Sequence, residues 1–350
     1  MNEAPGVDLR IEGKVGRITL DRPEALNALT LAMIEAMDRQ LRHWADDPGI
    51  AMVLIDGAGG RAFCAGGDIQ WLYARMKAGD LAKARWFFRA EYRLNQLIAT
   101  YPKPYVALMH GIVIGGGVGV SAHGSHRIVT DKTLLALPEC SIGLIPDVGT
   151  SCLLGRAPGR LGEYIGLTGL RLSGADAIAA GFADRCVASD RLAGVMRDMI
   201  ADAHPSVIDL AFAEGAPSTL PDQLPEIDRV FGADTVPDIV ARLRDSPADW
   251  APAALRAMLA ASPLSLNCAL TAIRHGRRFN AVWKALTTEY RYVYRALEQG
   301  DFAEGIRAAV IDKDRKPRWR KPGIDQITQA DVEAMLASLG EHELTARETA

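Results

Sequence analysis

The sequence predicts an α/β body over residues 1–204 and a helical region over residues 205–350. Two observations predict this division. In the first part, short apolar runs typical of strands alternate with patterns typical of helices, which favours an α/β fold. In the stretch 204–226 the composition shifts, and beyond it one helical pattern follows another. The prolines of that stretch are Pro205, Pro217, Pro221 and Pro225.

The composition is that of an ordinary globular enzyme or binding protein. Of 350 residues, 49% are hydrophobic and 24% charged, and the formal net charge of -3 argues against a nucleic-acid surface, which would be basic. The five cysteines contain no C-x-x-C pair, so they indicate reduced thiols rather than disulfides or a zinc site.

The ends and apolar runs of the chain carry no targeting or membrane signal. The N-terminal residues have no apolar signal core, and the longest apolar run, Val106–Ala122, is interrupted by His110 and several glycines. We therefore expect a cytoplasmic protein with no membrane partner.

The elements of the first part begin with two short strands, Val7–Ile11 and Val15–Leu20, joined by a turn. A helix follows, because Leu31, Ile34, Met37, Leu41 and Trp44 recur at helical spacing. The run from Ala51 to Asp56 is uninterrupted and apolar, as expected of a buried strand.

The next stretch, Gly57–Asp68, is rich in small residues and is predicted to be a loop. A long helix over about Ile69–Thr100, broken near Gly79, comes after it, and Tyr105–His110 forms another strand. In the second part, Ser262 followed by Pro263 marks the start of a helix.

A glycine run, Gly115–Gly119, follows the strand that ends near His110. Residues Gly117–Ala122, which begin within this run, fit the loose dinucleotide pattern G-x-G-x-x-A, and one interpretation is a nicotinamide or flavin site. The position of the pattern beyond residue 110 and the very short helix expected after it argue against that interpretation. Two other interpretations are close packing of a helix against a strand, and a backbone N–H that donates to an oxyanion at the start of a helix.

A second glycine loop, Ala65–Asp68, also ends just before a helix. It is consistent with an ordinary capped helix start. Two backbone donors from two separate loops are, however, what a tetrahedral acyl intermediate requires.

Two acids, Glu139 and Asp147, lie eight residues apart among apolar residues. Pro138 and Pro146 exclude one continuous helix, and the spacing allows both side chains to face one cavity. An apolar setting raises the pKa of a carboxyl group, which suits general acid or base chemistry, although structural pairing explains the spacing equally well.

Other candidate sites have less support. The histidines His110, His123 and His126 lack the spacing of metal ligands, and Cys140 has no evident base partner. The basic run 313–321 is consistent with contacts to phosphate groups and equally with a solvated charged segment.

Several stretches, in this order, resemble the crotonase (enoyl-coenzyme A hydratase/isomerase) superfamily over about residues 7–200. They are Asp21–Leu29, Arg61–Ile69, Lys103-Pro104, His110-Gly111 with Gly115–Gly117, and Pro138–Pro146. The resemblance implies a spiral of ββα units that binds an acyl-coenzyme A (acyl-CoA) thioester. It also implies an oxyanion hole formed by the N–H groups of Gly67 and Gly116.

Within the superfamily, hydratases carry a second glutamate shortly after the glycine triplet, where this chain has Gly119. Asp147 stands where many hydratases have a small residue. Most of the chain is instead similar to the branch that hydrolyses 3-hydroxyisobutyryl-CoA. That resemblance implies substrate contacts for Glu91, Gly116, Glu139 and Asp147. Thr150 replaces an expected glycine beside them.

The resemblance therefore implies a thioesterase in which Glu139 attacks the carbonyl or activates water, with Gly67 and Gly116 as donors and Asp147 and Glu91 orienting the substrate. It implies no metal and no cofactor, since CoA is part of the substrate, and allows a homo-oligomer. The alternatives are an enoyl-CoA hydratase or isomerase on the same fold, a dinucleotide enzyme, and a non-catalytic acyl-CoA binder.

Overall fold

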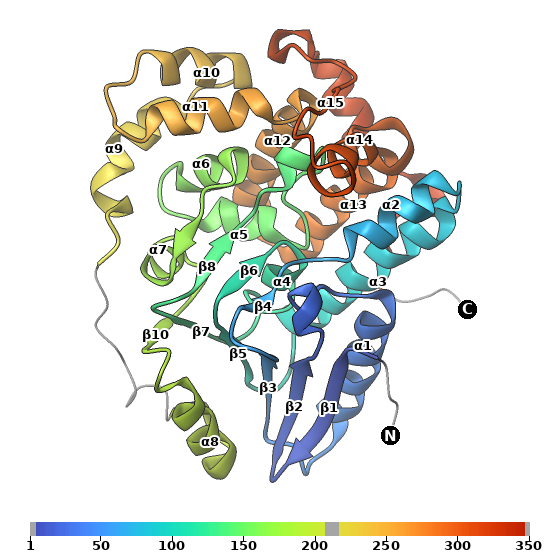
Figure 1. Cartoon of the computed structure of the whole chain (residues 1–350), viewed down its shortest axis with the longest axis vertical. Helices are drawn as coiled ribbons and strands as arrows, with labels where there is room; N and C mark the ends of the chain where they lie inside the picture. Colours follow the sequence, from blue (N-terminus) through green and yellow to red (C-terminus); the bar gives the residue numbers. More distant parts are fainter. Residues whose placement is uncertain (1–4, 207–216, 347–350) are drawn as a thin grey trace. The chain divides into compact units, whose positions relative to one another are not determined.

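A computed structural model describes residues 5–206 and 217–346 (Figure 1). The chain forms two compact units, each built from stretches that are separate in the sequence. The sheet unit takes the described residues of Met1–Gly67, Arg93–Ala136 and Arg171–Leu220. The helical unit takes the described residues of Asp68–Tyr92, Leu137–Leu170 and Pro221–Ala350.

The predicted division into 1–204 and 205–350 remains a prediction about domains. Part of the proline-containing stretch on which it depends, residues 207–216, lies outside the described residues. The compact units follow a different partition, in which Leu137–Leu170 groups with the C-terminal helices.

The sheet unit contains two sheets. In the larger sheet β1 and β2 pair as an antiparallel hairpin, and the other neighbouring strands run parallel. Its order is β1 (Val7–Glu12), β2 (Val15–Leu20), β3 (Met52–Gly57), β5 (Tyr105–Met109), β7 (His126–Thr130) and β10 (Arg185–Val187). The smaller sheet has the order β4 (Ala62–Cys64), β6 (Ile112–Ile114), β8 (Leu134–Ala136) and β9 (Leu172–Ser173).

Successive strands alternate between the two sheets. From β3 to β8 the chain contributes one strand to the larger sheet and the next to the smaller one. Helices follow these pairs: α1 (Leu31–Asp46) follows β2, α2 (Ile69–Lys77) and α3 (Leu81–Ala99) follow β4, and α4 (Gly116–Gly119) follows β6. The order along the chain is thus two strands and then helix, which confirms the predicted α/β class.

Local signals account for most of these elements. The Thr30 hydroxyl accepts from the Met33 N–H at 3.2 Å and caps α1, whose buried face includes the predicted Ile34, Met37, Leu41 and Trp44. The predicted break in the long helix separates α2 from α3. The stretch Gly57–Asp68, predicted as a loop, contains strand β4, because pairing with β6 stabilises three residues too few to show a strand pattern.

The core of the sheet unit lies on the apolar runs of the larger sheet. Val15, Leu54 and Val106 belong to a buried cluster on one face, against which α8 (Leu192–Asp202) packs. Elsewhere in this unit the Trp44 ring of α1 lies against Gly16 of β2, where an added Cβ would come within 2.6 Å of the ring. Only glycine fits that contact without displacing the tryptophan.

The helical unit is built around α12 (Pro263–Phe279), which packs against α5 (Thr150–Arg156), α6 (Leu161–Thr168) and α13 (Val282–Gln299). As predicted, α12 begins after Ser262, whose hydroxyl accepts from the Ser265 N–H at 3.1 Å. Its other helices include α9 (Leu220–Phe231), α10 (Val236–Arg244), α11 (Ala251–Ala260), α14 (Phe302–Ile306) and α15 (Gln329–Leu336). This unit also contains α2 and the part of α3 up to Tyr92.

The contact between α5 and α12 is unusually close. A Cβ on Gly276 would lie 2.1 Å from the Ser151 carbonyl oxygen, and one on Gly155 would lie 2.3 Å from the Arg277 nitrogen. The two backbones therefore touch where each helix has a glycine. This contact fixes the segment that follows Asp147 against α12.

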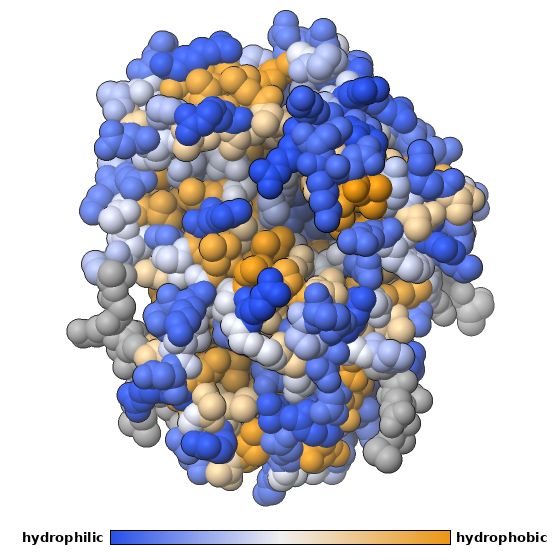
Figure 2. Space-filling model, in the orientation of Figure 1, coloured by the Kyte–Doolittle hydropathy of each residue, from blue (hydrophilic) through white to orange (hydrophobic). Residues whose placement is uncertain are grey.

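Polar and charged residues cover much of the face shown in Figure 2, and apolar residues form separate patches among them. No single helix in the described part of the chain is long and apolar enough to cross a membrane. The helices α11 and α12, bent at 115°, pass that test of length and composition only when taken together.

Candidate active site

Four carboxylic acids are buried near one another in the helical unit. Three of them are the predicted Glu91 of α3, Glu139, which begins the short 3₁₀ helix η2 (Glu139–Ile142), and Asp147, in the loop before α5. The fourth is Glu289 of α13, which is completely buried. The structure thus groups the predicted acids in one unit and adds one that sequence reasoning missed.

Burial raises the pKa of all four acids, because it removes the water that stabilises a charged carboxylate. The charge of Asp147 is a further cause that raises the pKa of Glu91, Glu139 and Glu289. For Glu289 the pKa rises to about 8. Carboxyl groups whose pKa values approach neutrality are suited to exchange protons near neutral pH.

Asp147 is held by specific hydrogen bonds. The Tyr92 hydroxyl donates to its Oδ2 at 2.7 Å, which lowers the pKa of Asp147 against the larger effect of burial. The Asp147 carbonyl oxygen accepts from the backbone N–H and the hydroxyl of Thr150, at 2.9 and 2.7 Å. The residue at which an expected glycine is replaced therefore supports the turn that carries Asp147.

Glu139 and Glu91 each have a buried oxygen without a partner. Among the described residues, Oε2 of Glu139 and Oε1 of Glu91 make no hydrogen bond. A buried polar atom without a partner is costly, so such atoms are expected where a ligand completes the site. Both positions are among the substrate contacts predicted from the sequence, and that role stays a prediction.

Glu289 and Tyr92 were not predicted as site residues from the sequence. Glu289 lies on the buried face of α13 beside Leu286, Tyr290 and Val293. A charged residue on an otherwise apolar face was a signal that could have identified it. Tyr92 directly follows Glu91 and gave no comparable signal, because its role depends on a contact with Asp147, distant in the sequence.

The two predicted backbone donors lie in the sheet unit. The loop before α2 and the start of α4 are close: a Cβ on Gly66 would lie 3.7 Å from the Gly116 nitrogen. Among the hydrogen bonds of the described residues, neither the Gly67 nor the Gly116 N–H donates to a protein acceptor. The role of the two N–H groups as an oxyanion hole stays a prediction.

The glycine run also explains a close backbone contact. A Cβ on Gly117 would lie 2.4 Å from the Cys64 carbonyl oxygen, so the run allows α4 to pack on β4. The helix α4 has only four residues, too short for the helix that supports a pyrophosphate in dinucleotide folds. The packing interpretation therefore accounts for Gly117 better than the dinucleotide pattern does.

Other candidates from the sequence have structural partners. The His110 Nε2 lies 2.8 Å from the Gly59 carbonyl oxygen. Burial raises the pKa of the Cys140 thiol, which keeps it protonated and unreactive. In the described ranges, no group of three His, Cys, Asp or Glu side chains could hold a metal ion. The expected lack of a cofactor remains a prediction.

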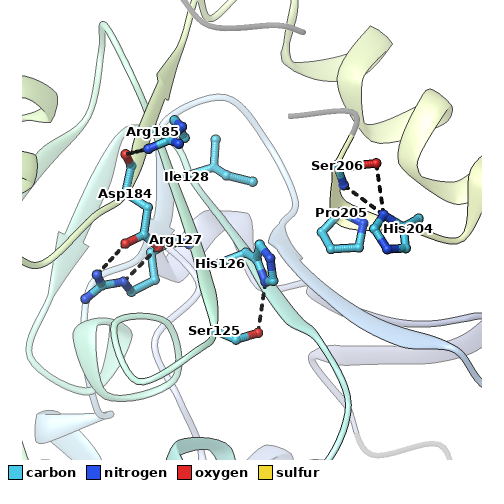
Figure 3. Close-up of a pocket in the computed structure, with 9 residues that line it drawn as sticks. All are labelled: Ser125, His126, Arg127, Ile128, Asp184, Arg185, His204, Pro205 and Ser206. Atoms are coloured by element: carbon cyan, nitrogen blue, oxygen red, sulfur yellow. Dashed lines mark hydrogen bonds and ion pairs between the residues drawn. The ribbon is translucent and has the colours of Figure 1, made fainter. Parts of the chain in front are cut away.

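A polar cavity of about 460 Å³ lies elsewhere in the sheet unit (Figure 3). Its walls include His126, Arg127 and His204, and Arg127 binds Asp184 through two hydrogen bonds, at 3.0 and 2.5 Å. None of the predicted site residues lines it. This cavity is therefore separate from the candidate site.

Known proteins match this chain over nearly its whole length. A family model described as enoyl-CoA hydratase/isomerase matches residues 15–336. The chain is 40% identical to the mitochondrial 3-hydroxyisobutyryl-CoA hydrolase of Xenopus laevis, over 95% of this chain and 89% of that protein. It is also 40% identical to the Homo sapiens protein of the same name, over 97% and 91%.

Two solved structures share the fold over nearly their full length. An enoyl-CoA hydratase from Rhodobacter sphaeroides 2.4.1 is 47% identical, with a TM-score of 0.92, over 97% of this chain and 99% of that one. A carnitinyl-CoA dehydratase from Mycobacterium thermoresistibile is 44% identical, with a TM-score of 0.93, over 98% and 99%. These likenesses confirm the predicted fold.

The predicted cytoplasmic location is wrong by comparison with these relatives. The curated relatives named above are mitochondrial proteins, so they do not support a cytoplasmic location. The expectation came from the absence of a targeting signal in the printed N-terminal residues.

Proposed function

The chain belongs to the enoyl-CoA hydratase/isomerase family, and we propose that it hydrolyses 3-hydroxyisobutyryl-CoA to 3-hydroxyisobutyrate and CoA. The observation that carries this proposal is Asp147. It is a buried carboxyl group whose charge raises the pKa of Glu139, whereas Gly119 stands where the family resemblance places the second glutamate of a hydratase. Relatives about 40% identical over nearly the whole chain, named as hydrolases of this thioester, support it.

In the proposed reaction, the N–H groups of Gly67 and Gly116 donate to the thioester carbonyl oxygen. Their donation strengthens as negative charge develops on that oxygen in the tetrahedral intermediate. Removal of one such donor costs about 2.7–4 kcal/mol of transition-state stabilisation in a comparable oxyanion hole. Among the described residues neither N–H has a protein acceptor, which supports this assignment.

Glu139 is the proposed acid–base group. As general base it takes a proton from water, whose oxygen bonds to the carbonyl carbon. The intermediate then breaks the carbon–sulfur bond, and the CoA thiolate receives the proton from Glu139. As nucleophile it would instead form a mixed anhydride that water hydrolyses. Asp147 and Glu91 orient the 3-hydroxyl group and the water in either route.

Replacement of Glu139 by glutamine tests its role. The change keeps the shape of the side chain but removes both basicity and nucleophilicity, so thiol release from 3-hydroxyisobutyryl-CoA should fall by about 10²–10⁴-fold. Glu163→Gln is the matched control, because Glu163 is likewise a buried glutamate but pairs with Arg160 and Arg277. Near-full turnover by Glu139→Gln would contradict the proposal.

The second candidate function is hydration or isomerisation of an enoyl-CoA, with Glu139 acting alone. It is favoured by the solved enoyl-CoA hydratase, which is 47% identical. A screen of short acyl-CoA thioesters, with and without a 3-hydroxyl group, separates the two functions when free thiol and crotonyl-CoA absorbance are followed together. Binding of the thioesters without turnover would indicate a non-catalytic binder, and binding of NAD(P) or flavin a dinucleotide enzyme.

The same proposal places the reaction in valine degradation, part of branched-chain amino acid catabolism. It requires no cofactor, because water is the second substrate and CoA is part of the first. A homo-oligomer remains a prediction that sedimentation of the purified protein would test.

A further inference from the structure

The backbone immediately after Asp147 is strained. Val148 has a φ of 53° and Gly149 a φ of 82°, so two consecutive residues occupy the left-handed region. This region is unfavourable for a β-branched residue such as valine. Such conformations persist where the surrounding structure holds them, and they occur mainly at functional sites.

Glu289 holds this strained turn from α13. One oxygen of its carboxyl group accepts from the Gly149 N–H at 2.6 Å, and the other accepts from the Ser151 N–H at 2.9 Å. The side chain is completely buried. A completely buried acid is uncommon unless it is paired, and here its partners are two backbone groups of one turn.

Tyr92 holds the side chain of Asp147, whereas Glu289 holds the backbone of the residues that follow it. Its hydroxyl donates to Oδ2 at 2.7 Å, and its ring is completely buried against the Tyr290 ring. The side-chain contact and the backbone contact come from two different helices, α3 and α13. Together they fix the orientation of the Asp147 carboxyl group.

We propose that Tyr92 and Glu289 are positioning residues, which hold the turn at residues 147–149 so that Asp147 presents its carboxyl group to the substrate. The expected loss of turnover when either residue is replaced rests on the proposed function. The expected change in the conformation of the turn at 147–149 does not. The titratable groups facing Asp147 are Tyr92, Glu91, Glu139 and Glu289. Replacement of either positioning residue should therefore act through Asp147.

The first test compares Tyr92→Phe and Glu289→Gln with wild-type enzyme. Phenylalanine loses only the donor to Oδ2, and glutamine presents an amide N–H₂ to one of the two backbone donors. We expect kcat for thiol release to fall roughly 10–100-fold with KM changed less than about 3-fold, the pattern of an interaction made in the transition state. Tyr290→Phe and Glu163→Gln are matched controls, because the Tyr290 hydroxyl accepts from Arg89 and Glu163 pairs with arginines.

The second test is a double-mutant cycle with Asp147→Asn. If Tyr92 and Glu289 act through Asp147, adding either change to Asp147→Asn should lower kcat by less than about 3-fold further. A purely structural role would give the same loss in both backgrounds. Equal losses, or unchanged kcat in both single variants, would overturn the proposal.

A pH profile provides a readout that a structural role would not change. The Tyr92 hydroxyl lowers the pKa of Asp147, so Tyr92→Phe should raise that pKa. Less negative charge then faces Glu139, whose pKa falls, so the acid limb of kcat/KM should move to lower pH. Tyr290→Phe should leave that limb in place. If Glu289→Gln fails to fold, Tyr92→Phe alone tests the proposal. The two measurements are then the shift of the acid limb of kcat/KM and the double-mutant cycle with Asp147→Asn.

Failure of the proposed function is distinguishable from failure of this inference. The former appears in the wild-type protein, which would release no thiol from any 3-hydroxyacyl-CoA. Crystal structures of wild-type, Tyr92→Phe and Glu289→Gln proteins then decide the inference without activity. An unchanged turn at 147–149 and an unchanged Asp147 rotamer in both variants would overturn it.

Discussion

At the scale of single residues, the candidate site depends on how close its acids lie to one another. Asp147 raises the pKa of Glu139 because both carboxyl groups are buried and water screens neither charge. The sequence was sufficient to propose Glu91, Glu139 and Asp147. It was insufficient for Glu289, because the contact between α13 and the turn after Asp147 joins residues separated by 140 positions.

Asp147→Asn makes this electrostatic coupling measurable. Removal of the Asp147 charge removes a cause that raises the pKa of Glu139, so that pKa should fall. The basic form of Glu139 then persists to lower pH, and the acid limb of the kcat/KM profile should move to lower pH while kcat falls. Asp198→Asn, on the exposed surface of α8, should move neither. An acid limb that stays in place would contradict the coupling.

At the scale of elements, local patterns predicted those helices and strands whose own residues specify them. The cap at Ser262, the periodicity of α1 and the strand pattern of β1 and β2 needed no tertiary information. The three-residue strands β4, β6 and β8 did, because each is defined by pairing with strands far along the chain. For the same reason the sequence did not predict the close contact of α5 with α12.

Gly276→Ala tests that contact. The added methyl group would lie 2.1 Å from the Ser151 carbonyl oxygen, so α12 must move away from α5. Overpacking of this kind costs typically about 1–3 kcal/mol, and we expect a matching loss of unfolding free energy in urea, with lower kcat because Ser151 shifts. Gly60→Ala is the control, since an added Cβ there meets no atom within 4 Å. Equal stability of the two variants would show that the contact is adaptable.

At the scale of the whole molecule, the buried acids make the stability of the fold depend on pH. Folding transfers four carboxyl groups from water into the helical unit, where each binds its proton more tightly. Between the unfolded and the folded pKa, the folded state therefore binds more protons than the unfolded state. Its stability falls as pH rises through that window.

For Glu289 this window extends from the ordinary pKa of a glutamate, 4.5, to about 8. Stability measured by urea unfolding should thus decrease between these pH values. Glu289→Gln should decrease less steeply, because glutamine does not titrate. A wild-type profile that is flat, or that rises, between pH 5 and 8 would contradict the raised pKa values of the buried acids.

The Glu289 contact has a consequence for how such a chain can change by recombination. A segment ending at residue 204 carries Glu91, Glu139 and Asp147. The carboxylate that accepts from the Gly149 N–H in the turn after Asp147 belongs to α13. Exchange of the C-terminal part with that of a relative lacking this glutamate would transfer the reactive acids without their support. The two parts of the sequence are therefore expected to be inherited together, and a chimera joined near residue 204 should be functional only when both parents keep the Glu289 contact.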